Sequence, residues 1–220
     1  VIVLIIGVSA LALGLPSSAQ TAPELFLSWG AENYAPADYQ GKVLPARKSK
    51  VSASVALIEN GKIADLSKQE IRWFLDRELE NSGRGLNQIS FIVPDFASGS
   101  IRLRAVLIGY RGADLEKTAV VPVADPELVI DAPYPEKKIA LGINIFQALA
   151  YFFNIRSVKE LSWVWSANGE KTVGGGDLPD RLELDASAGQ SGNEINLTVG
   201  ASNRSNPLEL ANVSMNLIIR

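Results

Sequence analysis

The sequence predicts an all-β chain built from two β-sandwiches in series, and three observations lead to this prediction. Beyond the first twenty residues, apolar residues alternate with polar ones far more often than they recur at helical spacing. Runs of about five to nine residues are separated by turn residues such as Asn-Gly and Pro. The pattern also occurs twice, because each half has a tryptophan-bearing strand in its middle and two long strands at its end.

The first half supplies its strands in a regular order. Residues 50–58 (KVSASVALI) alternate between an apolar and a serine-rich face, and the Asn60-Gly61 pair that follows is typical of a tight hairpin. The glycine-containing stretch 82–85 is predicted to be a turn. Further strands are predicted in IRWFLD (71–76), QISFIVP (88–94), SIRLRAVLIGY (100–110) and TAVVPV (118–123).

The second half repeats this organisation after a short joint. Its predicted strands are ELVID (127–131), KIALGINIFQALAYFF (138–153), LSWVWSA (161–167), RLELDA (181–186), EINLTVGAS (194–202) and ANVSMNLIIR (211–220). In the second of these, one strand face is predicted to carry Ile139, Leu141, Ile143 and Ile145. Residues 146–157 have a competing interpretation, in which they begin a helical turn.

Two tryptophans stand one residue apart in the stretch LSWVWSANGEKT, residues 161–172. On a strand, Trp163 and Trp165 share one face, and the Asn-Gly pair that follows predicts a hairpin. We expect both rings, together with Trp73 of the first half, to belong to the structural core, since bulky rings fill the centre of a sandwich. Only one of the neighbouring pair need be fully buried, and an exposed partner could contact a sugar or a protein.

Each half has about the hundred residues of an immunoglobulin-like sandwich. The predicted domains are therefore residues 21–124 and 125–220, both immunoglobulin-like β-sandwiches. Pro126 suits a short and fairly stiff joint at residues 124–127, because proline restrains its own backbone and that of the residue before it.

Residues 1–20 are predicted to be a secretory signal peptide. An uninterrupted apolar run covers Val1 to Leu15, and the small residues Ser17 and Ala19 follow at the spacing that a signal peptidase prefers. The competing interpretation is an uncleaved anchor that attaches the protein to a membrane, although the run is short of the roughly 20 residues of a span. Either interpretation predicts a secreted or cell-envelope protein on the extracellular face.

The amino-acid composition excludes several kinds of catalytic and metal site. The chain has no histidine and no cysteine, so catalytic triads, Cys-His dyads, His/Cys zinc sites and His- or Cys-ligated haem are excluded. We expect no cofactor and no enzyme activity. Lys+Arg 21 against Asp+Glu 24 gives a net charge of -3 without a basic run, so we expect no nucleic acid partner.

The halves resemble bacterial extracellular immunoglobulin-like or PKD-like (cadherin-like) modules. The resemblance rests on Trp163 or Trp165 with Asn168-Gly169, and on the later strand Ile195-Asn196-Leu197-Thr198-Val199; the first half offers Trp73 and residues 101–105. Unlike antibody domains, the chain has no cysteine pair beside its tryptophans. The resemblance implies adhesion, spacing or assembly at a cell envelope, with a protein or glycan at the cell surface as partner.

A loop-rich aromatic segment is the candidate ligand site. Trp29, Tyr34 and Tyr39 lie in SWGAENYAPADYQGKVLP, among proline and glycine residues. Tyrosine and tryptophan are enriched in binding surfaces. The plainer interpretation is that these rings hold an irregular loop against its sandwich.

The string Leu75-Asp76-Arg77-Glu78 matches the LDRE string of cadherin repeats, whose acidic residues bind interdomain calcium. The joint could add Asp125, Glu127 and Asp131, since calcium needs several oxygen ligands. The calcium hypothesis therefore names Asp76, Glu78, Asp125 and Glu127. The alternative is a solvated strand end, because the cadherin linker motif is absent.

Another acidic set, Asp177, Asp180, Glu183 and Asp185, raises the hypothesis of a glycosidase using paired carboxylates. The favoured interpretation is that these residues form the polar side of an edge strand. The sequence thus favours a non-catalytic structural or adhesive module of tandem immunoglobulin-like domains. The alternative is a carbohydrate-binding β-sandwich protein that uses exposed aromatic rings.

Overall fold

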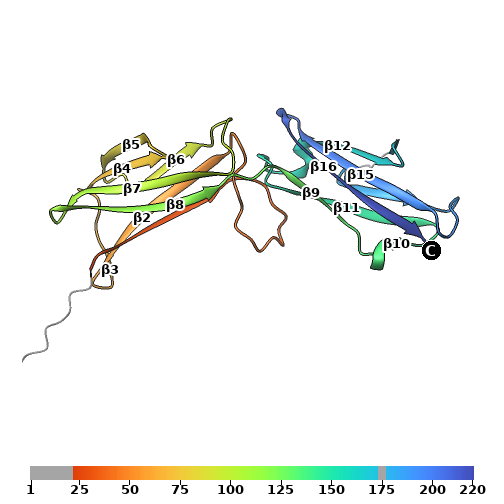
Figure 1. Ribbon diagram of the computed structural model, residues 1–220, viewed down its shortest axis with the longest axis horizontal. Coiled ribbons are helices and arrows are strands. Elements are labelled where there is room, and N and C mark those ends of the chain that lie inside the picture. Colours follow the sequence, from red (N-terminus) through yellow and green to blue (C-terminus); the bar gives the residue numbers. More distant parts are fainter. Residues whose placement is uncertain (1–21, 173–176) are drawn as a thin grey trace, which may run out of the picture.

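A computed structural model of the chain describes residues 22–172 and 177–220. In these ranges the chain forms strands β1 to β16 and two single 3-10 turns, η1 (Pro135–Lys137) and η2 (Val158–Glu160). Figure 1 shows the strands gathered into two sandwiches along the long axis, so the predicted all-β fold is confirmed. The predicted signal or anchor segment, 1–20, lies outside the described residues. None of the helical segments described has the length and hydropathy of a membrane span.

The first sandwich packs two antiparallel sheets against each other. One sheet has the order β1-β2-β6, with β3 pairing the end of β2, and the other has the order β5-β4-β7-β8. The strands are β1 (Glu24–Ala31), β2 (Lys50–Glu59), β3 (Lys62–Ile63), β4 (Glu70–Leu75), β5 (Glu78–Arg84), β6 (Gln88–Ile92), β7 (Ser100–Tyr110) and β8 (Ala113–Pro122).

The second sandwich repeats this strand order. One sheet is β14-β11-β9 and the other is β10-β16-β15-β12-β13, in which only β10 and β16 run parallel. The strands are β9 (Glu127–Asp131), β10 (Lys138–Ile139), β11 (Ile143–Tyr151), β12 (Leu161–Ala167), β13 (Glu170–Thr172), β14 (Arg181–Asp185), β15 (Glu194–Asn203) and β16 (Asn206–Ile219). Thus β1-β2-β6 corresponds to β9-β11-β14, and β8-β7-β4-β5 corresponds to β16-β15-β12-β13.

One tryptophan occupies the same place in each sandwich. Trp73 on β4 and Trp165 on the corresponding β12 are 0% and 2% exposed. The indole N–H of Trp73 donates to the carbonyl of Leu86 (2.8 Å), two residues before β6, and that of Trp165 donates to the carbonyl of Pro179 (3.1 Å), two residues before β14. Each ring therefore fills a core while its polar edge fixes the start of a strand in the facing sheet.

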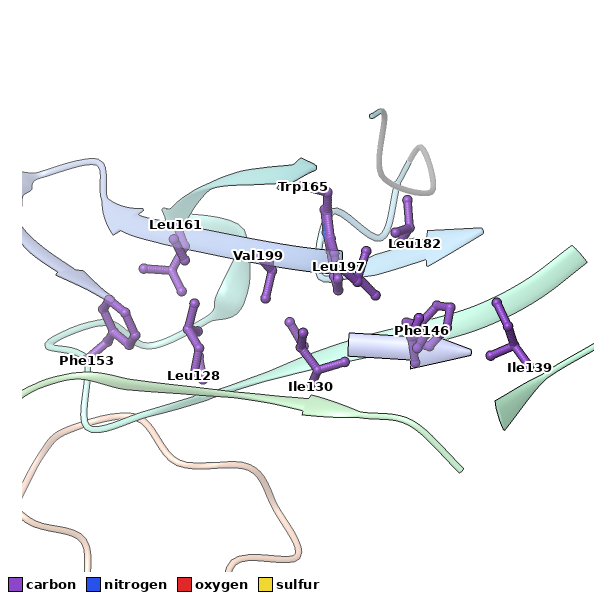
Figure 2. Packing of buried hydrophobic residues seen from close by; sticks show 14 of the residues in the cluster. Leu128, Ile130, Ile139, Phe146, Phe153, Leu161, Trp165, Leu182, Leu197 and Val199 are labelled. Atoms are coloured by element: carbon purple, nitrogen blue, oxygen red, sulfur yellow. The ribbon is translucent and has the colours of Figure 1, made fainter. Parts of the chain in front are cut away.

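Each sandwich has its own hydrophobic core. In the second, Trp165, Leu197 and Val199 from one sheet face Phe146 and Ile130 from the other (Figure 2). The first core is formed in the same way around Trp73, with buried residues drawn from residues 25 to 121. The predicted boundary at residues 124–127 lies between the two sets of core residues, but it stays a prediction.

Both predicted Asn-Gly hairpins are present. Asn60 and Gly61 connect β2 to β3, and Asn168 and Gly169 connect β12 to β13. All four residues have positive φ angles between 49° and 83°. Two successive positive φ angles are what a two-residue turn between right-twisted strands requires, and Asn-Gly adopts them at little cost.

Two details of the sequence prediction and one competing interpretation are wrong. Residues 82–84 belong to β5 and are not a turn; the chain turns afterwards at Gly85. Residues 146–151 continue β11, so no helical turn begins there. The face assigned to 138–145 is also wrong, because Leu141, Ile143 and Ile145 are more than half exposed.

The reversed face has a local cause. Ile139 is buried on β10, but Gly142 then adopts a left-handed φ of 98° and the chain passes to the other sheet. At the start of β11 the buried residues are therefore Asn144 and Phe146 and not the isoleucines beside them. Asn144 can be buried because its amide donates to two carbonyls of the preceding loop, at 2.9 and 3.0 Å.

Candidate functional site

The two sandwiches are connected by more than the linker at residues 124–127. Residues 32–49, which join β1 to β2 and which we call the strap, reach from the first sandwich to the second (the orange loop in Figure 1). The N–H of Tyr34 donates to the carbonyl of Phe153 (2.8 Å), and the N–H of Phe152 donates to the carbonyl of Tyr34 (2.7 Å). The ring of Tyr34 packs against the second core. The strap is therefore anchored in the second sandwich by backbone and side chain together.

Phe152 has an unusual backbone conformation at this contact. Its φ is 62°, and the residue is only 8% exposed. The left-handed region costs a residue with a Cβ atom about 1–2 kcal/mol. Both of its backbone groups are bound by the strap, since its carbonyl also accepts from Nδ2 of Asn33 at 2.8 Å. The strap thus contributes to holding a strained residue, and such residues concentrate at functional positions.

Asn33 joins the two ends of the strap to each other and to the second sandwich. Its buried amide donates to Oγ of Ser49 at 2.8 Å as well as to Phe152. The same Ser49 hydroxyl accepts from the N–H of Ala46 at 3.1 Å, which closes the strap on itself. Oδ1 of Asn33 is buried and accepts no hydrogen bond from the described residues.

The strap also contacts the linker. The N–H of Ala124 donates to the carbonyl of Pro45 (2.9 Å), and Arg47 forms an ion pair with Asp125 at 3.2 Å. Both side chains of the ion pair are well exposed, so the pair adds little stability. The backbone contacts carry this connection.

An aromatic hollow of about 290 Å³ lies where the strap meets the second sandwich. It is lined by Tyr39, Glu127, Val129, Tyr151 and Phe152. The ring of Tyr39 lies edge-on to Tyr151 (5.6 Å between centroids) and to Phe152 (5.8 Å). Such edge-to-face contacts fix the orientation of the rings that line the hollow.

Negatively charged side chains surround the hollow. Burial raises the pKa of the Tyr151 phenol above 10.0, and the charges of Asp38, Glu127 and Asp131 and the neighbouring Tyr39 raise this pKa further. Tyr151 is therefore a neutral hydroxyl at physiological pH. Ring faces beside carboxylate acceptors suit a ligand that has both an apolar face and hydroxyl groups, as sugars do.

The structure separates the three aromatic residues predicted to bind a ligand. Tyr39 lines the hollow, whereas Tyr34 is part of the strap anchor. Trp29 packs against the first core, and Nζ of Lys42 lies 3.4 Å from its ring centroid. Burial lowers the pKa of Lys42. Trp29 therefore makes a cation–π contact within the protein, and it lines a separate surface hollow on the first sandwich.

The residues of the calcium hypothesis do not form a cluster. Oδ1 of Asp76 accepts the N–H of Arg102 at 2.9 Å, and Asp125 pairs with Arg47. Glu127 lines the aromatic hollow, and Glu78 lies at the exposed start of β5. Within residues 22–172 and 177–220, no three Asp, Glu, His or Cys side chains converge as a metal site requires.

The acidic residues of the glycosidase hypothesis have separate structural contacts. Asp180 is buried and accepts from Nε2 of Gln147 at 3.2 Å. Asp185 accepts the hydroxyl and the N–H of Ser187, and these hydrogen bonds lower its pKa. Glu183 is exposed on β14, which is an edge strand.

The neighbouring tryptophans differ in burial. Trp165 is buried, whereas Trp163 is partly exposed and packs against the margin of the same core. The indole N–H of Trp163 donates to the carbonyl of Val158 in η2, at 3.0 Å. Trp163 therefore covers the turn that precedes its strand.

Sequence reasoning missed Asn33, Tyr151 and Phe152. Asn33 and Phe152 are 119 residues apart, and nothing in either local pattern indicates that they meet. Tyr151 lay at the end of a predicted strand. The Pro- and aromatic-rich composition of residues 28–45 was the available signal, and it identified most of the strap without identifying its contact.

Comparisons with known proteins give the chain no family. No protein family and no curated protein matches its sequence. Among solved structures, it is similar to the three N-terminal domains of the highly immunogenic outer capsid protein (Hoc) of bacteriophage RB49, with a TM-score of 0.46, 10% identity, and coverage of 90% of this chain and 59% of that one.

Two further solved structures are similar over most of the chain. One is SGBP-B of a Bacteroides ovatus mixed-linkage glucan utilization locus, in complex with a heptasaccharide (TM-score 0.26, 13% identity, 91% of this chain and 47% of that one). The other is a Ca²⁺-stabilised adhesin with which an Antarctic bacterium binds ice (TM-score 0.29, 12% identity, 88% and 49%). The chain thus spans about half to three-fifths of these solved chains, and at such scores the similarities say nothing about its function.

Proposed function

We propose that the protein is a secreted or cell-envelope module whose two sandwiches, residues 21–124 and 125–220, form a structural or adhesive spacer of fixed orientation. The observation that supports this most is the strap. It pairs with Phe152 and Phe153 and places Tyr34 on the second core. Flexible linkers leave two domains free to reorient, whereas backbone hydrogen bonds between them do not.

Export is part of the same proposal and depends on the apolar run at residues 1–15. A spacer that projects from a surface transmits position only when its units keep a constant angle. Specific contacts with a partner would then come from loops or exposed strand edges, as in other sandwiches.

The experiment measures whether the units tumble together. In ¹⁵N relaxation measurements on the chain, we expect amides of both sandwiches to fit one anisotropic diffusion tensor. Separate correlation times for the two sandwiches would contradict the proposal. Protease digestion of intact cells of the source organism tests the location, and we expect the protein to be cleaved without cell lysis.

Carbohydrate binding is the second candidate, and the aromatic hollow is the observation that favours it. Tyr39 and Tyr151 offer rings beside the carboxylate of Glu127. Stacking of a sugar on such rings needs no metal and no mobile loop.

A panel of neutral oligosaccharides immobilised on a surface tests this candidate. We expect Tyr39→Ala and Tyr151→Ala to abolish any binding, and we expect Phe96→Ala to retain it, because Phe96 is a highly exposed ring outside the hollow. Binding that survives both tyrosine substitutions would exclude the hollow as the site.

A further inference from the structure

Strand β16 has an open edge along most of its length. Its inner neighbour β15 pairs with it regularly from Leu210 to Ile218. On the other side, β10 pairs only with Ile218 and Ile219. Among the described residues, no strand pairs with the outer edge of the stretch Leu210 to Asn216, which we call the free edge.

The hydrogen bonds at the end of β16 show which residues of the free edge direct their N–H and C=O groups to the open side. The N–H of Arg220 donates toward β10, to the carbonyl of Ile139, whereas the N–H of Ile219 donates to Asn193 on the opposite side. Backbone groups of successive strand residues alternate between the two sides. The N–H and C=O groups directed to the open side are therefore those of Leu210, Asn212, Ser214 and Asn216. Without a partner these groups bind water, and another β-strand can replace that water along the whole row.

The free edge also has no charged residue. The only charged residue of β16 is Glu209, and its buried carboxylate accepts from the N–H of Asn154 and from Nδ2 of Asn203, both at 2.6 Å. The side chains of Ser214 and Asn216 lie on the exposed face of the sheet and form hydrogen bonds with β15, at 2.8 and 2.6 Å. Nothing on this strand repels an approaching strand.

The corresponding strand of the first sandwich is different. Strand β8 occupies the same edge position, but it carries Asp114, Glu116 and Lys117 along its length and ends at Pro122, whereas the proline and the charge of β16, Pro207 and Glu209, precede the free edge. Charges and proline on an edge strand are the usual protection against pairing with another chain. Two sandwiches with the same strand order thus differ in this protection, which indicates that the β16 edge is open for a reason particular to the second sandwich.

We propose that a second copy of this chain binds the free edge, β16 against β16, in antiparallel orientation. The free edge is centred on Val213, so a twofold axis there places Asn212 opposite Ser214 of the second copy, and Leu210 opposite Asn216 of the second copy. In this register every outward-directed residue meets another outward-directed residue. A twofold contact of this kind closes after two copies, and it joins the two sheets that contain β16 into one.

The strand is self-complementary, which favours a second copy over an unrelated strand. Its outward side chains are uncharged amides, hydroxyls and leucine, so no like charges face each other across the axis. Both free edges are also satisfied by the same contact. An unrelated strand would leave the edge of the second copy open.

Sedimentation velocity of the full chain over a range of concentrations tests the proposal. We expect a concentration-dependent dimer. The double variant Asn212→Lys with Ser214→Lys places lysines directly opposite each other, and we expect it to weaken dimerisation by roughly tenfold or more. The matched control is Thr118→Lys with Val120→Lys on β8, which we expect to dimerise like the unchanged chain, because those residues lie on the corresponding edge of the first sandwich.

A charge exchange separates edge pairing from simple misfolding. The double variant Asn212→Glu with Ser214→Glu should also be monomeric alone, but an equal mixture with the lysine variant should form a mixed dimer, since each lysine then faces a glutamate. Mixing Asn212→Cys with Ser214→Cys should give a disulfide between copies under mild oxidation, because directly opposite strand residues lie within disulfide range. A chain that stays monomeric, or a dimer that is unaffected by the lysines on β16, would overturn the proposal.

Discussion

Replacing Asn33 by alanine tests whether the strap stabilises the contact between the sandwiches. The amide of Asn33 donates to the carbonyl of Phe152 and to the hydroxyl of Ser49, both at 2.8 Å. Alanine removes both donors while leaving the backbone pairing of Tyr34 in place. The variant therefore isolates the side-chain contribution to the strap.

The expected cost follows from these contacts. Each hydrogen bond contributes about 1 kcal/mol net, and the buried carbonyl of Phe152 loses a donor, which adds about 1–3 kcal/mol. One effect acts in the opposite direction, because alanine also removes the buried and unpaired Oδ1 of Asn33. Removing an unsatisfied acceptor restores about 1–2 kcal/mol. We therefore expect a net loss of about 1–4 kcal/mol in the free energy of unfolding.

Asn33→Asp is a second variant for this test. Aspartate has nearly the shape of asparagine, but its carboxylate only accepts hydrogen bonds, whereas the amide also donates them. A carboxylate donates nothing to Phe152 and repels that carbonyl, so this variant should be less stable than Asn33→Ala at pH 7. A buried carboxyl without a partner has a raised pKa in the folded state. The folded state then binds the proton more tightly than the unfolded state does. The free energy of unfolding of this variant should therefore rise as the pH falls toward about 4, the ordinary pKa of an aspartate.

Urea unfolding followed by tryptophan fluorescence gives these energies, since each sandwich contains tryptophans. Gln88→Ala serves as the control, because Gln88 is exposed on β6, and we expect a change of less than about 0.5 kcal/mol. ¹⁵N relaxation of Asn33→Ala should show looser coupling of the two sandwiches. Unchanged stability and unchanged tumbling in both Asn33 variants would refute the role assigned to the strap.

Three further predictions concern the cores, the hollow and a turn. Trp165→Ala should cost about 3–5 kcal/mol of unfolding free energy in urea, and Trp163→Ala less than half of that, because only Trp165 is fully buried. The pKa of Tyr151 is raised above 10.0 in the folded state, so its contribution to stability is present below pH 10 and is lost as the pH rises further. Tyr151→Phe should therefore reduce the fall in melting temperature at alkaline pH. An unaltered fall would contradict this. Gly85→Ala should cost at least about 1–2 kcal/mol, since φ is 68° and a Cβ would lie 2.8 Å from a backbone oxygen, whereas Gly30→Ala, with open space, should change the melting temperature little.

The fold could be predicted because alternation is a local signal. The strands containing Val51, Ile101 and Leu197 bury the residues that alternation places inward, and the Asn-Gly pairs fix two hairpins. The exception is instructive. Alternation from Ile139 to Ile145 is unbroken in the sequence, but Gly142 moves the chain to the other sheet, and periodicity contains no information about such a change.

The site could be predicted only in part, because its contacts are non-local. Aromatic composition identified the segment that contains Tyr39, yet the partner rings of Tyr39 lie more than a hundred residues later, on Tyr151 and Phe152. Composition also grouped Trp29 with Tyr39, although the first packs on its own core. Residue type indicates that an aromatic ring will make contacts. Only the tertiary arrangement decides whether that ring packs in a core, anchors a loop or lines a hollow.

The repeated strand order explains why the strap lies where it does. It connects the first two strands of its sandwich, and β1 and β8 both end at the linker side, so this connection faces the sandwich that follows. The corresponding connection of the second sandwich, residues 132–142, instead contributes β10, which pairs with the last residues of β16. One position in the fold thus serves two purposes: in the first sandwich it binds the neighbouring unit, and in the second it covers only the end of β16 and leaves the rest of that edge open. Inserting strand-forming residues before Lys138, so that β10 becomes long enough to cover the free edge, should therefore suppress pairing of β16 between copies in sedimentation velocity without altering the strap.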